Sequence, residues 1–132
     1  PTTHIDHLDA SKPTQGYDDI LRALRRSRLY LHDGEQEYTI TLLEAMMTGM
    51  PLVSFAIPGI ERYVVHGHNG FVGRSAKVIR EHCRLLPDDE DLARKMGAAS
   101  RAMAVAQYDE RRWRADWIRT IDNFMRPRAG SR

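Results

Sequence analysis

Residues 36 to 74, QEYTITLLEAMMTGMPLVSFAIPGIERYVVHGHNGFVGR, contain the pattern that decides the fold. The run LLEAMM predicts a helix to about Thr48, because Gly49 suits a left-handed helix end and Pro51 cannot continue a helix. The nearly continuous apolar run at 52–57 is typical of a buried parallel strand. A glycine-punctuated loop, PGIERYVVHGHNG, follows it and leads to a last short strand, FV.

The residues before this segment continue the alternation of helices and strands. A helix beginning at Tyr17 carries apolar residues at helical spacing, and a short apolar strand follows at 29–31. A weaker, partly polar strand candidate lies at 3–8. Strands that alternate with helices indicate right-handed crossovers and a parallel sheet. We therefore predict an α/β fold: a partial Rossmann-like domain with a small parallel sheet flanked by helices and a helical C-terminal half.

Beyond Arg74 the sequence predicts three amphipathic helices. Their apolar stripes consist of Val78, Ile79, Cys83 and Leu86; of Leu92, Met96, Ala99 and Met103; and of Trp113, Trp117, Ile118, Ile121 and Phe124. We expect the two tryptophans, one turn apart, to anchor the third helix across the sheet. We predict a single domain over 1–126 and a flexible tail over 127–132.

Composition excludes several classes of protein. The chain has 132 residues and a formal charge of +2, so no nucleic-acid partner is expected. The single Cys83 allows no disulfide within the chain and fits a reducing compartment, and no apolar run is long enough to span a bilayer. A cytoplasmic location is therefore predicted. The histidine pairs HxxH (from His4) and HxH (from His66) lack further ligands, so no metal site is expected.

The loop that leads from strand 29–31 into the following helix is the candidate site. In parallel sheets, ligands bind beyond the carboxyl ends of the strands, and a helix N-terminus there favours a phosphate. A carboxylate one turn inside the helix, Glu44, could accept hydrogen bonds from a ribose diol. A structural role competes with this one: Thr41 and Glu44 fit a capping box, and Thr39 is a rival cap. A phosphoacceptor receiver domain, with Asp33 as acceptor, is a weaker alternative.

The order of motifs resembles a known family. The segment LLEAMMTGMPLVSF followed by PGIERYVVHGHNGFV is similar to the donor-binding core of family-4 type retaining glycosyltransferases of GT-B architecture (glycosyl transferases group 1). Downstream, LLPDDEDLARKMGAASRAM and YDERRWRADWIRTI resemble the helices that follow this core. The resemblance implies the donor-binding C-terminal domain of a hexosyltransferase that acts in polysaccharide biosynthesis.

The resemblance also implies roles for individual residues. Glu44 matches the second glutamate of the family's Glu-x7-Glu motif, which holds the nucleotide ribose. The first glutamate falls on Gln36, and the adjacent Glu37 offers a carboxylate, so these two are the implied catalytic positions. The implied donor-binding residues are Tyr38, Thr39, Ile40, Thr41 and Glu44. The donor would be a UDP- or GDP-sugar, with no metal or other cofactor.

Further expectations concern partners. The family's acceptor-binding domain, and the arginine and lysine that neutralise the leaving diphosphate, would precede Pro1, so the chain alone is expected to be inactive. A glycan or a lipid-linked acceptor would bind through that domain. A non-catalytic domain of the same fold, serving as a pseudoenzyme or assembly module, is the alternative. The arginines around the last apolar stripe suggest a peripheral contact with the inner face of a membrane, although solvated arginines explain the pattern equally well.

Overall fold

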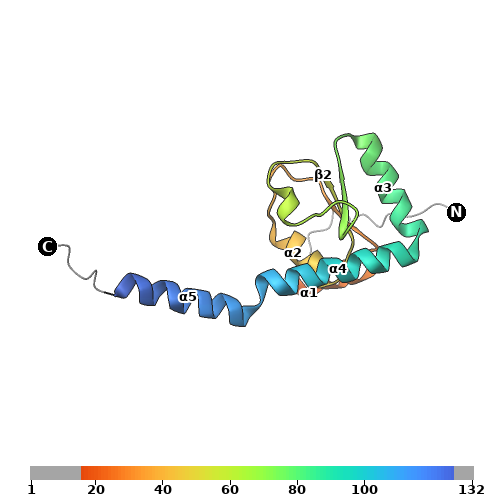
Figure 1. The fold of residues 1–132 in the computed structure, drawn as a ribbon. Helices are drawn as coiled ribbons and strands as arrows, with labels where there is room; N and C mark the ends of the chain where they lie inside the picture. The colour runs from red at the N-terminus through yellow and green to blue at the C-terminus, as the bar shows by residue number, and fades with distance from the viewer. Residues whose placement is uncertain (1–15, 127–132) are drawn as a thin grey trace.

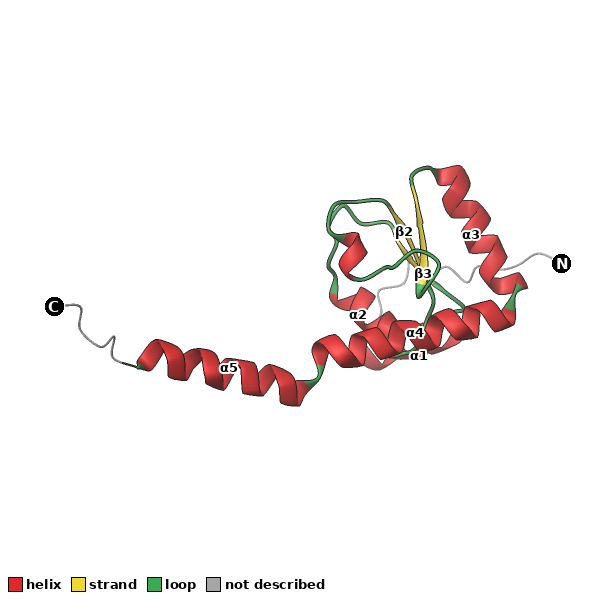
Figure 2. Cartoon of the chain, viewed as in Figure 1, coloured by secondary structure: helices red, strands yellow, loops and turns green. Residues whose placement is uncertain are grey.

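A computed structural model describes residues 16–126 of the chain, and Figure 1 shows their arrangement. The elements follow one another as α1 (Tyr17–Arg26), β1 (Tyr30–His32), α2 (Ile40–Met47), β2 (Leu52–Phe55), the 3-10 helix η1 (Ile60–Arg62), β3 (Gly70–Gly73), α3 (Ala76–Asp88), α4 (Glu90–Tyr108) and α5 (Glu110–Met125). Helices cover a small parallel sheet, as the sequence predicts (Figure 2). The predicted strand at 3–8 and the tail at 127–132 lie outside the described residues.

The sheet has the order β1-β2-β3, and both strand pairs are parallel. Tyr30 pairs with Leu52, and Leu52 pairs with Gly70, so the three carboxyl ends lie along one edge. Strand β1 is shifted by one residue from the predicted 29–31. Strand β2 ends at Phe55, earlier than the predicted 57, because the chain turns there and Ile57 donates its amide to the Phe55 carbonyl.

Each face of the sheet has its own core, because successive side chains of a strand point to opposite faces. On one face, Leu52 packs with Leu42 and Met46 of α2, Leu24 of α1 and Ala104 of α4. On the other, Val53 packs with Ile79 and Leu86 of α3 and Met96 of α4. Cys83 is half-buried against this second core, which agrees with the predicted packing role. Helix α4 therefore contributes to both cores.

Helices α2 and α4 approach closely at two glycines. Gly49 follows α2 with a φ of 78°, and the amides of Gly49 and Met50 bond the carbonyls of Met46 and Ala45, which is a Schellman motif. A Cβ on Gly97 of α4 would lie only 2.1 Å from the Gly49 carbonyl oxygen. The predicted glycine stop is confirmed, and the backbone of Gly49 is also the surface on which α4 packs.

Asn69 ties the loop after η1 to the sheet. Its side chain is fully buried; its Oδ1 accepts from the Val65 amide at 2.7 Å and its Nδ2 donates to the Tyr63 carbonyl at 2.7 Å. Its own carbonyl accepts from the Leu52 amide at 3.1 Å, at the start of β2. The buried side-chain amide thus closes the loop 63–69 on itself, and the backbone carbonyl of the same residue joins the loop to the central strand.

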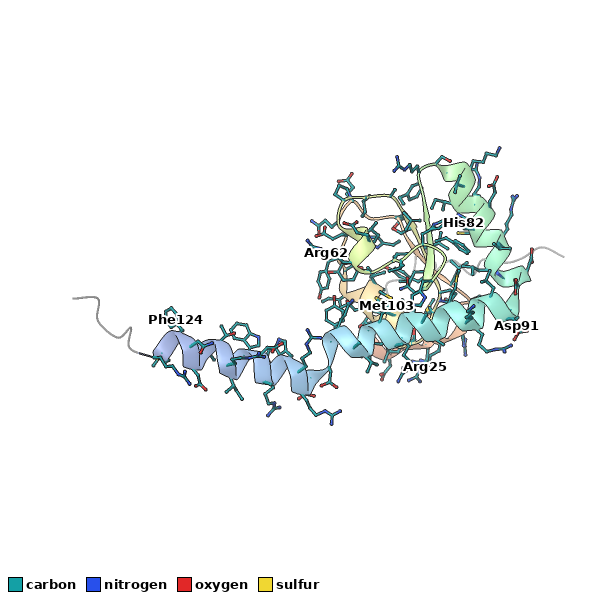
Figure 3. All side chains as sticks on the ribbon, viewed as in Figure 1. Arg25, Arg62, His82, Asp91, Met103 and Phe124 are labelled. Atoms are coloured by element: carbon teal, nitrogen blue, oxygen red, sulfur yellow. The ribbon has the colours of Figure 1, made fainter. Side chains whose placement is uncertain are left out.

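The prediction that the two tryptophans of helix α5 anchor it across the sheet is wrong. None of its residues is buried, and Figure 1 shows it extending away from the sheet beyond α4. Trp113 and Trp117 contact each other, with ring centroids 6.1 Å apart, and in Figure 3 the Phe124 side chain stands far from the sheet. The apolar stripe exists, as predicted, but none of its residues is buried among residues 16–126.

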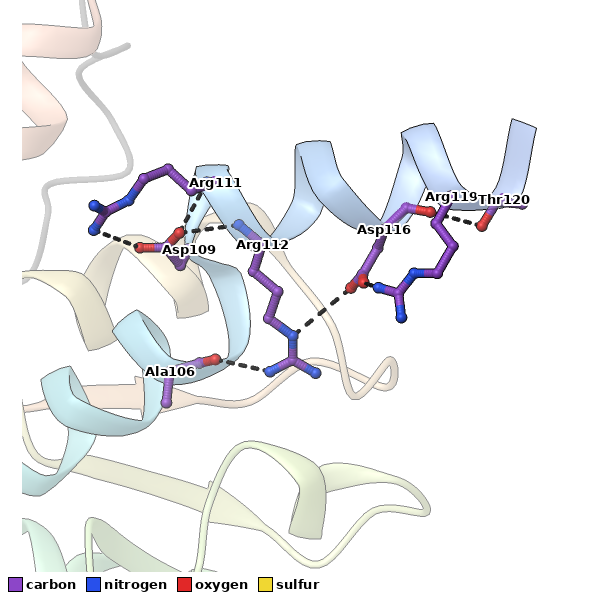
Figure 4. Close-up of polar contacts among 7 residues, drawn as sticks. All are labelled: Ala106, Asp109, Arg111, Arg112, Asp116, Arg119 and Thr120. Carbon is purple, nitrogen blue, oxygen red and sulfur yellow. Dashed lines mark hydrogen bonds and ion pairs between the residues drawn. The ribbon is translucent and has the colours of Figure 1, made fainter. Parts of the chain in front are cut away.

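Polar contacts set the start of α5 (Figure 4). Asp109 caps the helix by accepting from the amides of Arg111 at 2.8 Å and Arg112 at 3.1 Å. These backbone hydrogen bonds, first of all that of Arg112, lower the pKa of the Asp109 carboxyl. The Arg112 guanidinium donates back to the Ala106 carbonyl at 3.0 Å and so joins α5 to the end of α4. Asp116 pairs with both Arg112 and Arg119.

Within residues 16–126, no helix has both the length and the apolar character that crossing a bilayer would require.

Substituting Gly97→Ala tests the close contact between α2 and α4. Alanine normally stabilises a helix interior relative to glycine by about 0.5–1 kcal/mol. Here the new methyl group meets the Gly49 carbonyl, and we expect a net loss of about 1–3 kcal/mol in the free energy of unfolding, as for other overpacked cores. Urea unfolding followed by circular dichroism measures it, with the exposed Ala98→Ser as control. A stabilised Gly97→Ala protein would contradict the contact.

Substituting Asn69→Ala tests the buried amide. It leaves the Val65 amide and the Tyr63 carbonyl without their partner, so we expect a loss of about 2–4 kcal/mol in unfolding free energy. Asn123→Ala, on the exposed α5, is the matched control and should change it by less than about 0.5 kcal/mol. Equal stability of the two variants in thermal unfolding would show that Asn69 does not hold the loop.

Candidate functional site

The candidate site lies along the carboxyl edge of the sheet. Three loops leave the strands there: 33–39 after β1, 56–59 after β2, and 74–75 after β3. An open hollow of about 500 Å³ lies at this edge and is lined by Phe55, Ala56, Ile57, Pro58, Gly73 and Arg74. Ligands of parallel α/β sheets bind at such an edge, so the fold places the predicted loop where binding is expected.

The start of α2 decides between the two roles considered for Glu44. Thr39 is the N-cap: its Oγ1 accepts from the Leu42 amide at 3.1 Å, and its backbone is extended. A capping box needs a glutamate three residues after the cap, a position that Leu42 occupies. Glu44 stands two residues further along, so the capping box of Thr41 and Glu44 is wrong. The rival cap, Thr39, is the one observed.

The Glu44 carboxylate is instead surrounded by tyrosines. The Tyr17 phenol, at the first residue of α1, lies beside Glu44, and hydrogen bonding to this carboxylate together with its negative charge raises the pKa of Tyr17. Burial is the main cause of the raised pKa of Tyr30 on β1, with smaller contributions from the charges of Asp33 and Glu44. Glu44 is half-buried. The carboxylate thus lies beside a phenol of α1 and takes no part in the cap of its own helix.

Three contacts fix the loop between β1 and α2. His32 is 3% exposed, and its Nε2 lies 2.7 Å from the Gln36 carbonyl oxygen. The Glu37 side chain lies against Gly59, where a Cβ would come within 2.9 Å of the Glu37 Cγ. The Tyr38 ring lies 6.0 Å from that of Tyr63, centroid to centroid.

Most of the predicted site residues fall into two groups, and two residues belong to neither group. Glu44 and Thr39 lie near enough to Tyr30 to influence its pKa, which the Glu44 charge raises and a hydrogen bond with Thr39 lowers, although burial is the main cause of its shift. Gln36 and Tyr38 are exposed on the loop, with Glu37 half-buried between them. The remaining two have different surroundings: Ile40 is 67% exposed and Thr41 is half-buried in the first turn of α2.

Sequence reasoning missed three residues that shape this site, namely Tyr17, Tyr30 and His32. Tyr17 begins a predicted helix, Tyr30 lies within the predicted strand 29–31, and His32 is the first residue after that strand, so their positions were available. Their partners lie on other elements, and only the folded chain brings them together. Arg74 was not identified as a site residue either, although it lies immediately after the last strand.

His66 of the HxH pair has contacts within the loop and with α3. His66 Nδ1 accepts from the Val72 amide at 3.1 Å, and its ring meets Phe71 and His82, with centroids 5.5 and 5.8 Å away. Burial and the neighbouring His66 lower the pKa of His82, and the His82 ring stacks on that of Phe71 with ring centroids 4.2 Å apart. No group of three potential metal ligands occurs among residues 16–126.

Similarity to known proteins agrees with this geometry. Residues 6–103 match the family "Glycosyl transferases group 1". Over 95 residues the chain is 34% identical to the N-acetyl-alpha-D-glucosaminyl L-malate synthase of Bacillus anthracis. The matched region covers 69% of this chain and 25% of that protein. The chain thus spans about a quarter of the length of this curated relative.

Solved structures show the same fold at low identity. Anabaena HepE in complex with UDP has a TM-score of 0.69 at 20% identity, over 80% of this chain and 30% of that one. The pneumococcal O-GlcNAc transferase GtfA, in complex with UDP and GlcNAc, has a TM-score of 0.70 at 20% identity, over 82% of this chain and 23% of that one.

The extent of the family match excludes the receiver-domain alternative and leaves the glycosyltransferase resemblance as the correct one. The three-stranded parallel sheet of this chain, with its flanking helices, is GT-B-like. The chain belongs to the glycosyl transferases group 1 family.

Proposed function

We propose that this chain is the nucleotide-sugar-binding portion of a retaining glycosyltransferase that transfers a hexose from an NDP-sugar to a glycan or a lipid-linked acceptor. The observation that carries the proposal is Glu44. Its carboxylate stands one turn inside α2, is not used in the cap, and lies beside the Tyr17 phenol at the carboxyl edge of the sheet. A vicinal diol can replace that phenol with hydroxyl donors of the same kind.

The N-terminus of α2 is suited to the phosphates of such a donor. The first amides of a helix have no intrahelical partner, and the helix dipole favours negative charge there. Thr39 satisfies the amide of Leu42, and we assign the amides of Ile40 and Thr41 to the diphosphate. Thr39, Ile40, Thr41 and Glu44 then bind the nucleotide part of the donor. Arg74, at the same edge, is a cation within the chain that could add to the charge neutralisation.

The loop before α2 would hold the sugar. Gln36 offers an amide that donates and accepts hydrogen bonds but carries no charge. Glu37 supplies the carboxylate next to it, and Tyr38 closes the loop against Tyr63. We assign Gln36 and Glu37 to the neighbourhood of the reacting carbon. One structural relative, Anabaena HepE, has been solved in complex with UDP and in complex with UDP-glucose, which supports a UDP-sugar as the donor.

Catalysis would need residues in addition to those of this chain. Transfer needs a positioned acceptor and charge neutralisation at the leaving diphosphate. The relatives are about three to four times longer than the matched region, so we place acceptor binding in such additional sequence. The neutral Gln36 favours a second candidate function, a domain of this fold that binds donor without turnover.

Calorimetric titration tests donor binding. We expect the chain to bind UDP or GDP and the corresponding sugars, and Glu44→Gln to weaken the affinity by about 10- to 100-fold, because hydrogen bonds to a charged group contribute about 1.5–3 kcal/mol. Glu81→Gln, an exposed position on α3, is the matched control and should bind like the unaltered chain.

Two results would count against this assignment. A chain that binds none of these nucleotides, while keeping its circular dichroism spectrum, would exclude a donor site. Equal affinities of the Glu44→Gln and Glu81→Gln variants would exclude Glu44 as the ribose ligand. Donor binding without hydrolysis or transfer, in a protein that also carries an acceptor-binding domain, would favour the non-catalytic candidate.

A further inference from the structure

A buried histidine at the end of β1 contacts the inner side of the candidate sugar-binding loop. His32 is the last residue of β1 and is 3% exposed. It shares a sheet face with Tyr30, and the two rings stack with centroids 6.3 Å apart at an angle of 28°. Its Nε2 lies 2.7 Å from the Gln36 carbonyl oxygen. A carbonyl can only accept, so the hydrogen bond requires a proton on Nε2.

The loop is shaped around this imidazole. A Cβ on Gly34 would lie 3.3 Å from Cε1 and 3.5 Å from Nε2 of His32, so the backbone at residue 34 runs close over the ring edge. The chain leaves the strand, passes over the imidazole and returns its Gln36 carbonyl to the same ring. The imidazole therefore fills the inside of the turn, and its Nε2 bonds the Gln36 carbonyl on the opposite side of the turn.

Other elements hold the next two residues of the loop. Glu37 rests on Gly59, whose φ of 88° and close contact leave no room for a side chain. Tyr38 meets the buried ring of Tyr63. At Gln36 itself the side chain is exposed, and the contact that fixes its backbone is the hydrogen bond from His32.

We propose that His32 is a positioning residue of the donor site, which sets Gln36 and Glu37 relative to Glu44 through the bond from Nε2–H to the Gln36 carbonyl. The proposal rests on the proposed function for its effect on binding, but not for its effect on the loop. Sites that hold a sugar need their polar groups fixed by supporting contacts, because a displacement of about 1 Å can cost about 100-fold in rate. His32 would not itself touch the donor.

Two variants of similar size separate this role from simple packing. His32→Gln keeps an N–H donor near the position of Nε2, whereas His32→Leu fills the space without a donor. We expect His32→Leu to weaken NDP-sugar affinity by about 3- to 10-fold, the range of one ordinary hydrogen bond. His32→Gln should stay within about 2-fold of the unaltered chain. Gly34→Ala, which presses on the ring from outside the core, should weaken affinity as His32→Leu does.

Nuclear magnetic resonance tests the positioning without any ligand. In the unaltered chain, the nitrogen-15 shifts of the His32 ring should report the Nε2–H tautomer. Backbone order parameters of the Gln36 and Glu37 amides should remain like those of β2 in His32→Gln and should fall below about 0.6 in His32→Leu. A Nδ1–H tautomer, or loop order parameters that are equal in the two variants, would overturn the proposal.

The two proposals can fail separately. If no nucleotide binds but the tautomer and the order parameters behave as described, the donor site is wrong and the loop support stands. If nucleotides bind and both His32 variants bind equally well, the donor site stands and the positioning role is overturned.

Discussion

The packing of α2 against the sheet and against α4 is the constraint on which the rest of the structure depends. The Thr39 side chain begins the helix, and Gly49 ends it in a left-handed turn. Gly97 then brings α4 against that turn, in a space that excludes even one methyl group. Leu42 and Met46 are fully buried as a result. Because both ends of the helix are held, the direction of every side chain on α2 follows, including that of Glu44.

The site inherits its geometry from this placement. With Thr39 as the cap, Glu44 falls five residues after the cap and faces Tyr17 and Tyr30 rather than the helix end. The loop before α2 is then short, spans from His32 to Thr39, and is supported at Gln36, Glu37 and Tyr38 by other elements. A loop held in this way can present polar groups without the glycines that bring a backbone close to a ligand.

Much of the fold could be predicted because its signals are local. The glycine stop, the apolar run of β2 and the apolar stripes of α3 and α4 each depend on neighbours within a few residues, and all are observed. The last helix is the exception. Its apolar stripe predicted a helix correctly, but a stripe does not specify its partner, and α5 has no buried residue within the described chain.

By itself, the sequence determined the order of helices and strands, because this depends on residue type and spacing. Its motifs also resemble a known family, and that resemblance implied Glu44 as the candidate ligand. Only the tertiary structure decided which threonine caps α2, and with it whether Glu44 is free for a ligand. It also decided that Tyr17 reaches Glu44 and that His32 bonds the Gln36 carbonyl. The physical reason is that capping and support are contacts with defined distances and directions. A sequence pattern offers several candidates for each contact, and packing selects one.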